Sequence, residues 1–304
     1  MGNLSQKSIA LICVGLCIFL WSFVGVFAKF AQTGLDNYQY VFYSSVFSFL
    51  SLLILSIATK KIKLLFTYPF QTLLFLAFLG FLDFMFYLLL YYGYASSNGL
   101  EVLVMQYTWP IFIVLLSLVL LKEKLTINKT LSLIFGFFAM VVVVTKGDVL
   151  NIDFTNIRVI FIVMFSAFCF ALFSVLSKKV KINIVNAVTV YFLVATIYSF
   201  IAMQTFSHFV LPQKTEWFYT FINGVFINGV SYILWVKALK DLDASYVAPF
   251  TFLIPILAAF LLVLFFREDV YISYIVGLAL IVLSGLANTK LLNKLINFPK
   301  RSSK

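Results

Sequence analysis

The sequence predicts an all-α integral membrane protein with ten transmembrane helices, arranged as two inverted five-helix repeats. Three observations lead to this prediction. First, 63% of the 304 residues are hydrophobic and only 11% are charged, which leaves too few polar side chains to cover a water-soluble globular protein. Second, long apolar runs recur along the whole chain. Third, one of these runs, with a proline in its middle, reappears in the second half of the sequence.

Each apolar run approaches the roughly 20 residues that an α-helix needs to cross the hydrocarbon core. The connections between the runs are short, so we expect no soluble domain of any size. We predict helices at residues 9–30, 38–58, 70–92, 99–121, 127–146, 157–178, 185–206, 216–237, 244–266 and 272–291. We expect residues 1–150 to form the first repeat, and residues 151–304 to form the second repeat with a short basic tail.

The fourth and ninth predicted helices read as two copies of one element, GLEVLVMQYTWPIFIVLLSLVLLKE and ASYVAPFTFLIPILAAFLLVLFFRE. A proline lies 13 residues before the terminal glutamate in both copies, Pro110 before Glu123 and Pro255 before Glu268. Because the first repeat has an odd number of helices, the second enters the membrane from the opposite side. Inverted repeats with broken helices at matching places are typical of secondary transporters.

Basic residues predict the orientation of the chain. If the N-terminus is cytoplasmic, 17 of the 22 Lys and Arg residues lie on the cytoplasmic side, and the other five are Lys29, Lys146, Arg158, Lys214 and Arg267. This bias follows the positive-inside rule, so we predict that both termini are cytoplasmic. The net charge of +11 is spread over short segments. It therefore indicates contact with anionic lipid headgroups and not with nucleic acid.

Polar residues inside the third and eighth predicted helices are candidates for a cavity. Asp83 lies midway through an apolar run, where an acid tends to face water or a binding site, and Tyr87 follows one turn later. Asn228, Tyr232 and Trp235 occupy the corresponding face of the eighth helix. The alternative for Asp83 and Asn228 is hydrogen bonding between helices.

The fourth helix adds further candidates. Glu101 lies near its outer end, and Tyr107, Trp109 and Pro110 follow. Proline lacks a backbone donor, so the carbonyl group of Gln106 loses its helical partner. Irregular backbone at membrane depth is tolerated where it lines water or is packed in protein.

Two prolines have the same effect on the ninth helix, Pro249 and Pro255. We therefore predict broken helices at Pro110, Pro249 and Pro255. Glu123 and Glu268 are expected to be helix-end acids that pair with neighbouring basic residues, in preference to a role as gates.

The repeat layout and the Lys/Arg-Glu pair at the end of each fourth helix resemble the drug/metabolite transporter superfamily, EamA type, over essentially the whole chain. One segment, Glu101-Val102 followed by Gln106-Tyr107 and Trp109-Pro110, is similar to the aromatic amino acid exporters of bacterial inner membranes. Lys122 and Arg267 stand where the superfamily usually has Gly. The resemblance implies a central cavity, exposed alternately to each side of a bacterial cytoplasmic membrane, through which amino acids or similar amphiphilic metabolites move outward.

These residues suggest how a zwitterionic or cationic small molecule would bind. Aromatic rings would contact its apolar part, and these rings belong to Tyr87, Tyr107, Trp109, Tyr232 and Trp235. Glu101 or Asp83 would attract its ammonium group, with Asn228 as a further polar contact. Asp83 is alternatively a proton carrier that couples transport to a gradient.

Other functions remain as alternatives. A nucleotide-like or sulfonium metabolite such as S-adenosylmethionine is a second class of cargo that fits aromatic rings and an acid. A membrane scaffold would not need matched broken helices. An enzyme is disfavoured because the one histidine, His208, falls in a loop and no His–carboxylate cluster occurs in the spans. No cofactor and no metal site are expected, and the sequence does not predict the oligomeric state.

Overall fold

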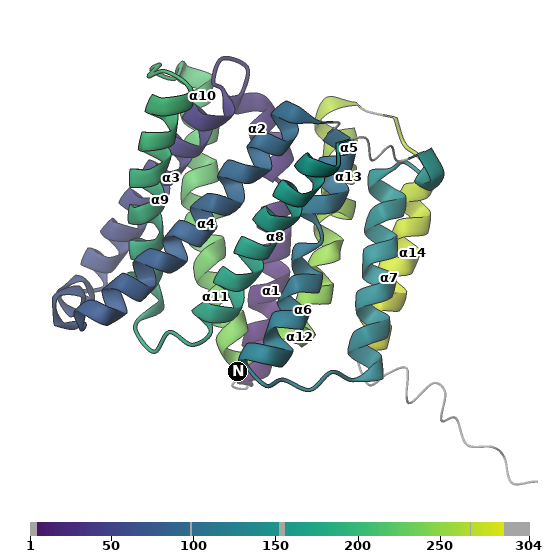
Figure 1. Ribbon diagram of the computed structural model, residues 1–304, viewed down its shortest axis with the longest axis horizontal. Helices are drawn as coiled ribbons and strands as arrows, with labels where there is room; N and C mark the ends of the chain where they lie inside the picture. The colour runs from purple at the N-terminus through teal and green to yellow at the C-terminus, as the bar shows by residue number, and fades with distance from the viewer. Residues whose placement is uncertain (1–4, 98, 152–155, 268, 289–304) are drawn as a thin grey trace, which may run out of the picture.

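The computed structural model describes residues 5–97, 99–151, 156–267 and 269–288, and every regular element in this part of the chain is helical (Figure 1). Nine helical spans among the described residues are long and apolar enough to cross a bilayer, and the shorter α14 (Ile272–Asn288) follows them. The predicted fold class, an all-α membrane protein, is confirmed. Residues 289–291, which we assigned to the last helix, lie outside the described residues.

Several spans are assembled from two or more helical pieces. The first five spans are α1 (Gln6–Ser22) with α2 (Val24–Ala31), α3 (Asn37–Ala58), α4 (Phe70–Ser96), α5 (Gly99–Gln106) with α6 (Trp109–Leu120), and α7 (Ile127–Val144). The next four are α8 (Ile157–Ser177), α9 (Ile184–Phe206), α10 (Lys214–Ile222) with η3 (Asn223–Val230) and α11 (Ser231–Asp241), and α12 (Ala244–Val247) with η4 (Ala248–Phe252) and α13 (Leu253–Phe266). Two short 3₁₀ helices, η1 (Ile62–Thr67) and η2 (Val149–Asn151), lie in connections.

Polar side chains fix the starts of several spans. The side chain of Asp36 accepts a hydrogen bond from the backbone N–H of Gln39, and the Gln39 side chain accepts one from the N–H of Asp36, both at 2.9 Å. Thr126 and Asn183 cap α7 and α9 in the same way, each accepting from an N–H three residues later. Such caps supply partners for N–H groups that the first helical turn leaves unpaired.

The two five-span units are inverted relative to each other. In Figure 1, α1 begins at the bottom, beside the N marker, whereas α8, the first helix of the second unit, begins at the top. We call the side on which α1 begins the near side, and the side on which α2 ends the far side. Opposite starting sides are what the odd number of helices in each unit requires.

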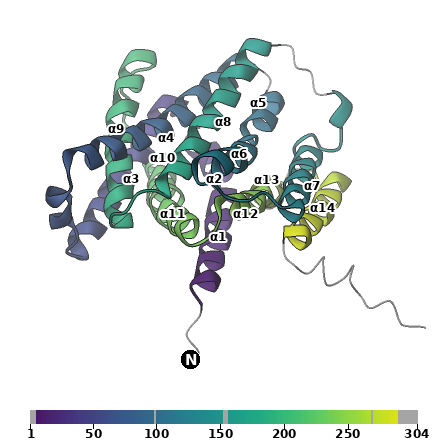
Figure 2. The same cartoon turned by 60° about the horizontal axis from the view of Figure 1, so that its bottom comes forward.

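Helix packing follows the same two-fold relationship. Equivalent helices pack on each other in two places, α3 on α9 and α7 on α14, and both pairs are visible side by side in Figures 1 and 2. Two other contacts exchange under the two-fold: α1 packs on α11, and α4 packs on α8. The repeat that the sequence predicts is therefore also present in the packing of the helices.

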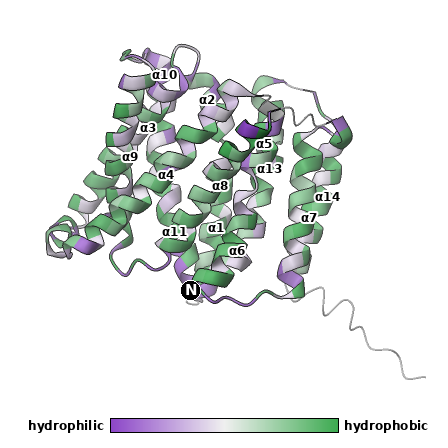
Figure 3. Cartoon of the chain, in the orientation of Figure 1, coloured by the Kyte–Doolittle hydropathy of each residue, from purple (hydrophilic) through white to green (hydrophobic). Residues whose placement is uncertain are grey.

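The outer surface matches a lipid environment. Hydrophobic residues cover most of the length of the helices, and polar residues gather near their ends (Figure 3). Between the helices, small polar side chains form ties: Ser132 Oγ lies 3.0 Å from Ser284 Oγ, and Ser56 Oγ donates to Asn186 Oδ1 at 2.6 Å. In lipid the hydrophobic effect does not drive helices together, so such close contacts and hydrogen bonds stabilise the bundle.

Candidate transport site

A cavity of ≈ 690 Å³ lies between the two units. Its walls come from α1 and α2, α4, α5 and α6, α7, α8, α11, α13 and α14. It reaches from the middle of the bundle to Gln32, Asn37 and Lys146, which lie at or just beyond helix ends on the far side. Binding pockets for small molecules commonly measure about 300–1,000 Å³, so this cavity has room for a metabolite.

The inner end of the cavity is a cluster of aromatic rings. The ring of Trp21 lies 6.2 Å from that of Trp109 and 5.9 Å from that of Phe170, centroid to centroid, with steep angles in both pairs. Trp109 and Phe170 themselves lie 5.1 Å apart at 83°. These edge-to-face contacts hold the rings in fixed orientations. Trp21, Trp109, Phe170 and Tyr232 all line the cavity, so it presents rigid ring faces and edges to whatever it contains.

Hydrogen bonds from the indole groups hold this cluster in place. Trp21 Nε1 donates to Ser231 Oγ at 2.8 Å, which joins α1 to α11. Trp235 Nε1 donates to Ser174 Oγ at 3.1 Å, which joins α11 to α8. The ring of Trp235 lies 5.2 Å from that of Trp21 and is fully buried. Trp235 therefore supports the ring cluster from behind and is not among the residues that line the cavity.

The outer part of the cavity is more polar. Tyr94 OH donates to Gln106 Oε1 at 3.2 Å, and Gln32 Nε2 donates to Asn37 Oδ1 at 2.7 Å. Lys146 is the one charged residue among the described residues that line the cavity, and its Nζ lies 4.8 Å from the ring centroid of Tyr271. A bound molecule would thus meet amide and hydroxyl groups and one positive charge near the far side.

A second, much smaller cavity of ≈ 20 Å³ lies beside the large one; we call it the side chamber. Asp83 lines it and is only 1% exposed. Tyr232 OH donates to Asp83 Oδ1 at 2.6 Å, while the Tyr232 ring lines the large cavity. Val24, Tyr87 and Tyr91 line both spaces. Asp83 therefore does not line the large cavity itself but accepts a hydrogen bond from Tyr232, which does.

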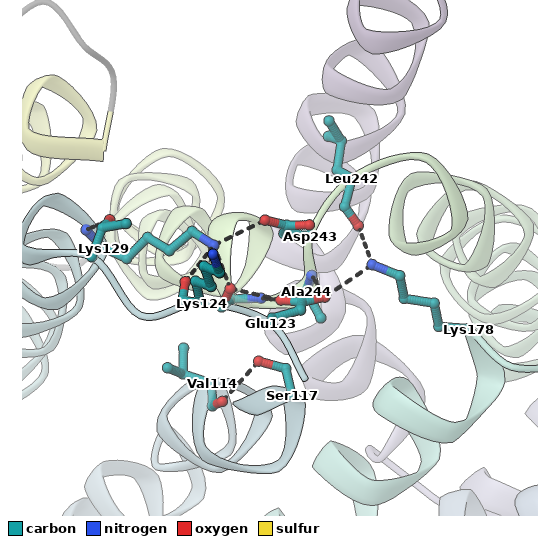
Figure 4. Close-up of polar contacts among 11 residues, drawn as sticks. Val114, Ser117, Glu123, Lys124, Lys129, Lys178, Leu242, Asp243 and Ala244 are labelled. Atoms are coloured by element: carbon teal, nitrogen blue, oxygen red, sulfur yellow. Dashed lines mark hydrogen bonds and ion pairs between the residues drawn. The ribbon is translucent and has the colours of Figure 1, made fainter. Parts of the chain in front are cut away.

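On the near side, a carboxylate bridges the two units. Glu123, just beyond α6, accepts hydrogen bonds from the backbone N–H groups of Ala244 and Ser245 at 2.8 and 2.9 Å, and from Ser245 Oγ at 2.6 Å (Figure 4). Lys178 Nζ, beyond α8, lies 2.9 Å from Glu123 Oε1 and also donates to the carbonyl oxygen of Leu242. We call Glu123, Lys178, Ala244 and Ser245 the latch.

The latch stabilises the ionised form of Glu123. Burial raises the pKa of this carboxyl group, but the hydrogen bonds from Ser245, Lys178 and Ala244 outweigh burial and lower the pKa to about 2. Because the carboxylate sits at the start of α12, it also pairs with N–H groups that the first turn leaves unbonded. A second tie lies beside the latch, where Lys129 Nζ is 2.9 Å from Asp243 Oδ2.

Four spans that border the cavities are interrupted, the first of them at Phe23 between α1 and α2. The fourth span stops being α-helical between Gln106 and Trp109, directly before Pro110. The ninth contains the 3₁₀ helix η4, with Pro249 near its start, and Pro255 follows in the first turn of α13. The eighth contains the eight-residue π-helix η3, which has no proline. Residues at these breaks have backbone geometry that a continuous α-helix does not offer.

The sequence candidates fall into three groups in the structure. Four of them line the large cavity: Tyr87, Tyr107, Trp109 and Tyr232. Asp83 and Asn228 line the side chamber. Glu101 and Trp235 line neither space; Glu101 is buried and accepts a hydrogen bond from Ser97 Oγ at 2.7 Å.

The three prolines predicted to break helices also differ in whether they line a cavity. All three prolines are buried; Pro255 lines the large cavity, whereas Pro110 and Pro249 line neither space. The expectation that Glu123 pairs with a neighbouring basic residue was wrong, because its ion-pair partner is Lys178 of the other unit. The equivalent glutamate, Glu268, lies outside the described residues.

Sequence reasoning did not select several residues that line the large cavity. Trp21 and Phe170 hold equivalent positions just past the middle of the first and sixth spans, so the internal repeat was a usable signal for both. Lys146 and Gln32 lie at helix ends, where polar residues are common, and nothing in their spacing distinguishes them from lipid-facing residues.

Comparison with known proteins identifies the family. Residues 8–145 and 157–288 each match the EamA-like transporter family. The chain is 27% identical over 212 residues to YoaV, an uncharacterized transporter of Bacillus subtilis, and the match covers 66% of this chain and 70% of that protein. It is 25% identical over 280 residues to the S-adenosylmethionine uptake transporter of Rickettsia prowazekii, covering 88% and 90% of the two chains.

A protein of known crystal structure shares the fold. It has a TM-score of 0.84 and 18% identity, with 94% of this chain and 98% of that chain covered. The two family matches together cover most of the sequence and one falls on each repeat. This multi-pass membrane protein therefore belongs to the EamA-like transporter family, and it is a transporter and not an enzyme.

Proposed function

We propose that this transporter moves small amphiphilic metabolites by alternating access, and that amino acids with aromatic or other apolar side chains are its first candidate cargo. The observation that carries the proposal is the cavity of ≈ 690 Å³, which has fixed aromatic rings at its inner end and polar groups toward the far side. An amino acid has the same division into an apolar side chain and a polar, charged end.

The two ends of the cavity would recognise different parts of such a molecule. Trp109, Tyr107 and the neighbouring rings would contact the apolar side chain. Lys146 would attract the carboxylate, since it is the one charge on the described lining. The ammonium group would bind to ring faces and to acceptor oxygens such as Gln106 Oε1. Glu101 has no place in this arrangement because it does not line the cavity.

Alternating access would use the two units as moving bodies, with residues 1–150 and 151–304 as the two units. Rocking of one inverted repeat against the other about a central site is a common transport mechanism. The latch holds the near side closed while the cavity reaches toward the far side. The positive-inside rule supports a cytoplasmic near side in a bacterium, and it is the basis on which we expect both termini to be cytoplasmic. Cargo released on the far side would then be exported.

S-adenosylmethionine is a second candidate, favoured by the relative from Rickettsia prowazekii. Its adenine ring would stack on the aromatic cluster, and its sulfonium cation would be attracted to ring faces. The positive charge of Lys146 disfavours a cation as the preferred cargo, because it would repel the cation and attract a carboxylate.

Counterflow in proteoliposomes tests both candidates. Liposomes preloaded with one unlabelled compound are assayed for uptake of the same radiolabelled compound, across aromatic and apolar amino acids, S-adenosylmethionine and nucleosides. We expect saturable exchange of amino acids. Exchange of S-adenosylmethionine alone would replace the first candidate with the second, and the absence of exchange across the whole panel would contradict the proposal.

A further inference from the structure

The side chamber contains an acid with no basic partner among the described residues that line it. Asp83 is almost fully buried near the middle of α4, and Tyr232 OH donates to it. None of the described lining residues is Lys, Arg or His. A carboxylate at membrane depth needs a positive charge nearby or a proton of its own. The chamber thus contains an acid whose charge, when the acid is ionised, no described lining side chain neutralises.

Three other polar atoms of the chamber also lack partners. Tyr40 OH, Ser44 Oγ and Asn223 Oδ1 are buried and make no hydrogen bond in the described part of the chain. Their residues are 2, 3 and 5% exposed, and all three line the chamber. Buried polar groups are nearly always paired with protein, water or an ion. Because the side-chain oxygen of an asparagine only accepts, it needs a donor or a cation.

The π-helix explains why two asparagines reach the same chamber. Asn223 and Asn228 both line it and are five residues apart. In an α-helix with 3.6 residues per turn, residues five apart point about 140° away from each other. A π-helix bonds each residue to the one five positions on, so such residues lie on the same face of the helix. The geometry of η3 therefore brings together two side-chain oxygen atoms, those of Asn223 and Asn228, that an α-helix would separate.

We propose that the side chamber binds one dehydrated monovalent metal cation of about sodium's size, held by the carboxylate of Asp83 and the side-chain oxygens of Tyr40, Ser44, Ser45, Asn223 and Asn228. Oxygen is the ligand atom that hard cations prefer. One carboxylate balances one positive charge. Divalent ions are poor candidates, since Mg²⁺ keeps several waters and Ca²⁺ is usually held by more than one carboxylate.

The size of the chamber supports a bare ion. Its volume of ≈ 20 Å³ accommodates about one water molecule, so a hydrated ion or an organic cation does not fit. Val24, Tyr87 and Tyr91 line both this chamber and the large cavity, so these are the side chains that an ion would have to pass on its way from the large cavity to Asp83.

One residue connects this cation to the cargo. The ring of Tyr232 lines the large cavity and its hydroxyl donates to Asp83, a ligand of the cation. A ring shift caused by cargo would therefore alter the ligand set, and cation binding would fix the ring. This coupling rests on the proposed transport function, whereas the cation site itself does not.

Binding of ²²Na⁺ to the purified chain in nanodiscs, by scintillation proximity at constant ionic strength with choline as the replacement cation, tests the site. We expect saturable binding that unlabelled Na⁺ displaces and choline does not. Asp83→Asn should abolish binding. Asn223→Ala and Ser44→Ala should weaken Na⁺ binding at least tenfold, and these two variants test the site if Asp83→Asn does not fold. Ser132→Ala, which removes a buried hydroxyl between α7 and α14, is the matched control and should bind as wild type.

Other results would overturn the proposal. A folded wild-type chain that binds no Na⁺, K⁺ or Li⁺ would leave Asp83 to be neutralised by a proton, with a water in the chamber. Equal binding by wild type and Asp83→Asn would place the ion elsewhere. The measurement uses no cargo, so cation binding without amino acid counterflow would reject the proposed function and keep the cation site. Amino acid counterflow without cation binding would keep the proposed function and reject the cation site.

Discussion

Lys178 Nζ lies 2.9 Å from Glu123 Oε1, so an ion pair joins the end of α8 in one unit to the segment after α6 in the other. The same carboxylate accepts two backbone N–H groups at the start of α12. Under the proposed alternating access the near side must open, and α6, α8 and α12 all end or begin there. Opening must therefore break these contacts, which makes the latch a point at which single substitutions shift the balance between conformations.

Glu123→Gln should favour opening of the near side. Removing one partner of an ion pair costs ~1 kcal/mol or less at an exposed site and ~3–5 kcal/mol at a buried one, and the Glu123 side chain is only 6% exposed. We expect a cysteine introduced at the buried Val247 to react several-fold faster with an impermeant maleimide in the Glu123→Gln background. Lys179→Met, which removes an exposed neighbouring charge, should leave labelling unchanged.

The latch should be insensitive to pH between about 5 and 8. The pKa of Glu123 is lowered to about 2, so the stability it contributes is complete above the usual value of 4.5 and is lost as the pH falls toward 2. The difference in melting temperature between wild type and Glu123→Gln should be constant from pH 8 to 5 and shrink below about pH 4. A difference that disappears between pH 7 and 6 would mean that Glu123 is not held as described.

The spans and their repeat could be predicted because their signals are local in sequence. An apolar run of about 20 residues identifies a span wherever it packs, and Pro110 and Pro255 reveal the repeat through their equal distance from a glutamate. Helix–helix partners are not local. Lys178 is 55 residues from Glu123, and its position at a helix end is equally typical of a lipid-facing lysine.

The rotation of each helix about its axis was the main unknown for the site. Asp83 and Tyr87 share a helix face, yet Tyr87 also reaches the large cavity while Asp83 lines only the side chamber. The π-helix η3 could not be predicted, because it contains no proline and its two glycines, Gly224 and Gly229, are equally typical of close packing between regular membrane helices. Gly224 in this helix approaches α3 so closely that a Cβ atom there would lie 2.5 Å from the carbonyl oxygen of Ser44.

Gly224→Ala should therefore destabilise the fold and disturb the side chamber. The added methyl group forces η3 away from the backbone of α3, and overpacking of this kind typically costs ~1–3 kcal/mol. We expect a lower melting temperature in detergent for Gly224→Ala. Gly15→Ala is the control, since nothing lies within 4 Å of a Cβ at that position, and alanine is the better helix former. A Gly224→Ala variant as stable as wild type would contradict the close packing of η3 on α3.

Trp109→Ala should weaken cargo binding. The buried indole group forms part of the inner end of the cavity, and losing contact with such a ring removes ~1.5–3 kcal/mol, roughly a tenfold to hundredfold loss of affinity. The apparent Km for counterflow of an aromatic amino acid measures this loss. Trp217→Ala is the control, because that ring packs against Tyr43 and Phe47 away from the cavity. Equal effects of the two substitutions would point to general destabilisation and not to cargo contact.

Lys146→Gln should change which molecules compete for the cavity. With the single charged group of the described lining removed, a carboxylate loses its attraction, and a positively charged competitor loses a repulsion. We expect amino acids to inhibit counterflow at least several-fold less well in Lys146→Gln, while the corresponding decarboxylated amines inhibit as well as before or better. Lys146→Arg keeps the charge and should resemble wild type. If amino acids and amines lose potency equally in Lys146→Gln, then Lys146 does not read the carboxylate, and the polar end of the cargo is recognised by uncharged groups such as Gln106.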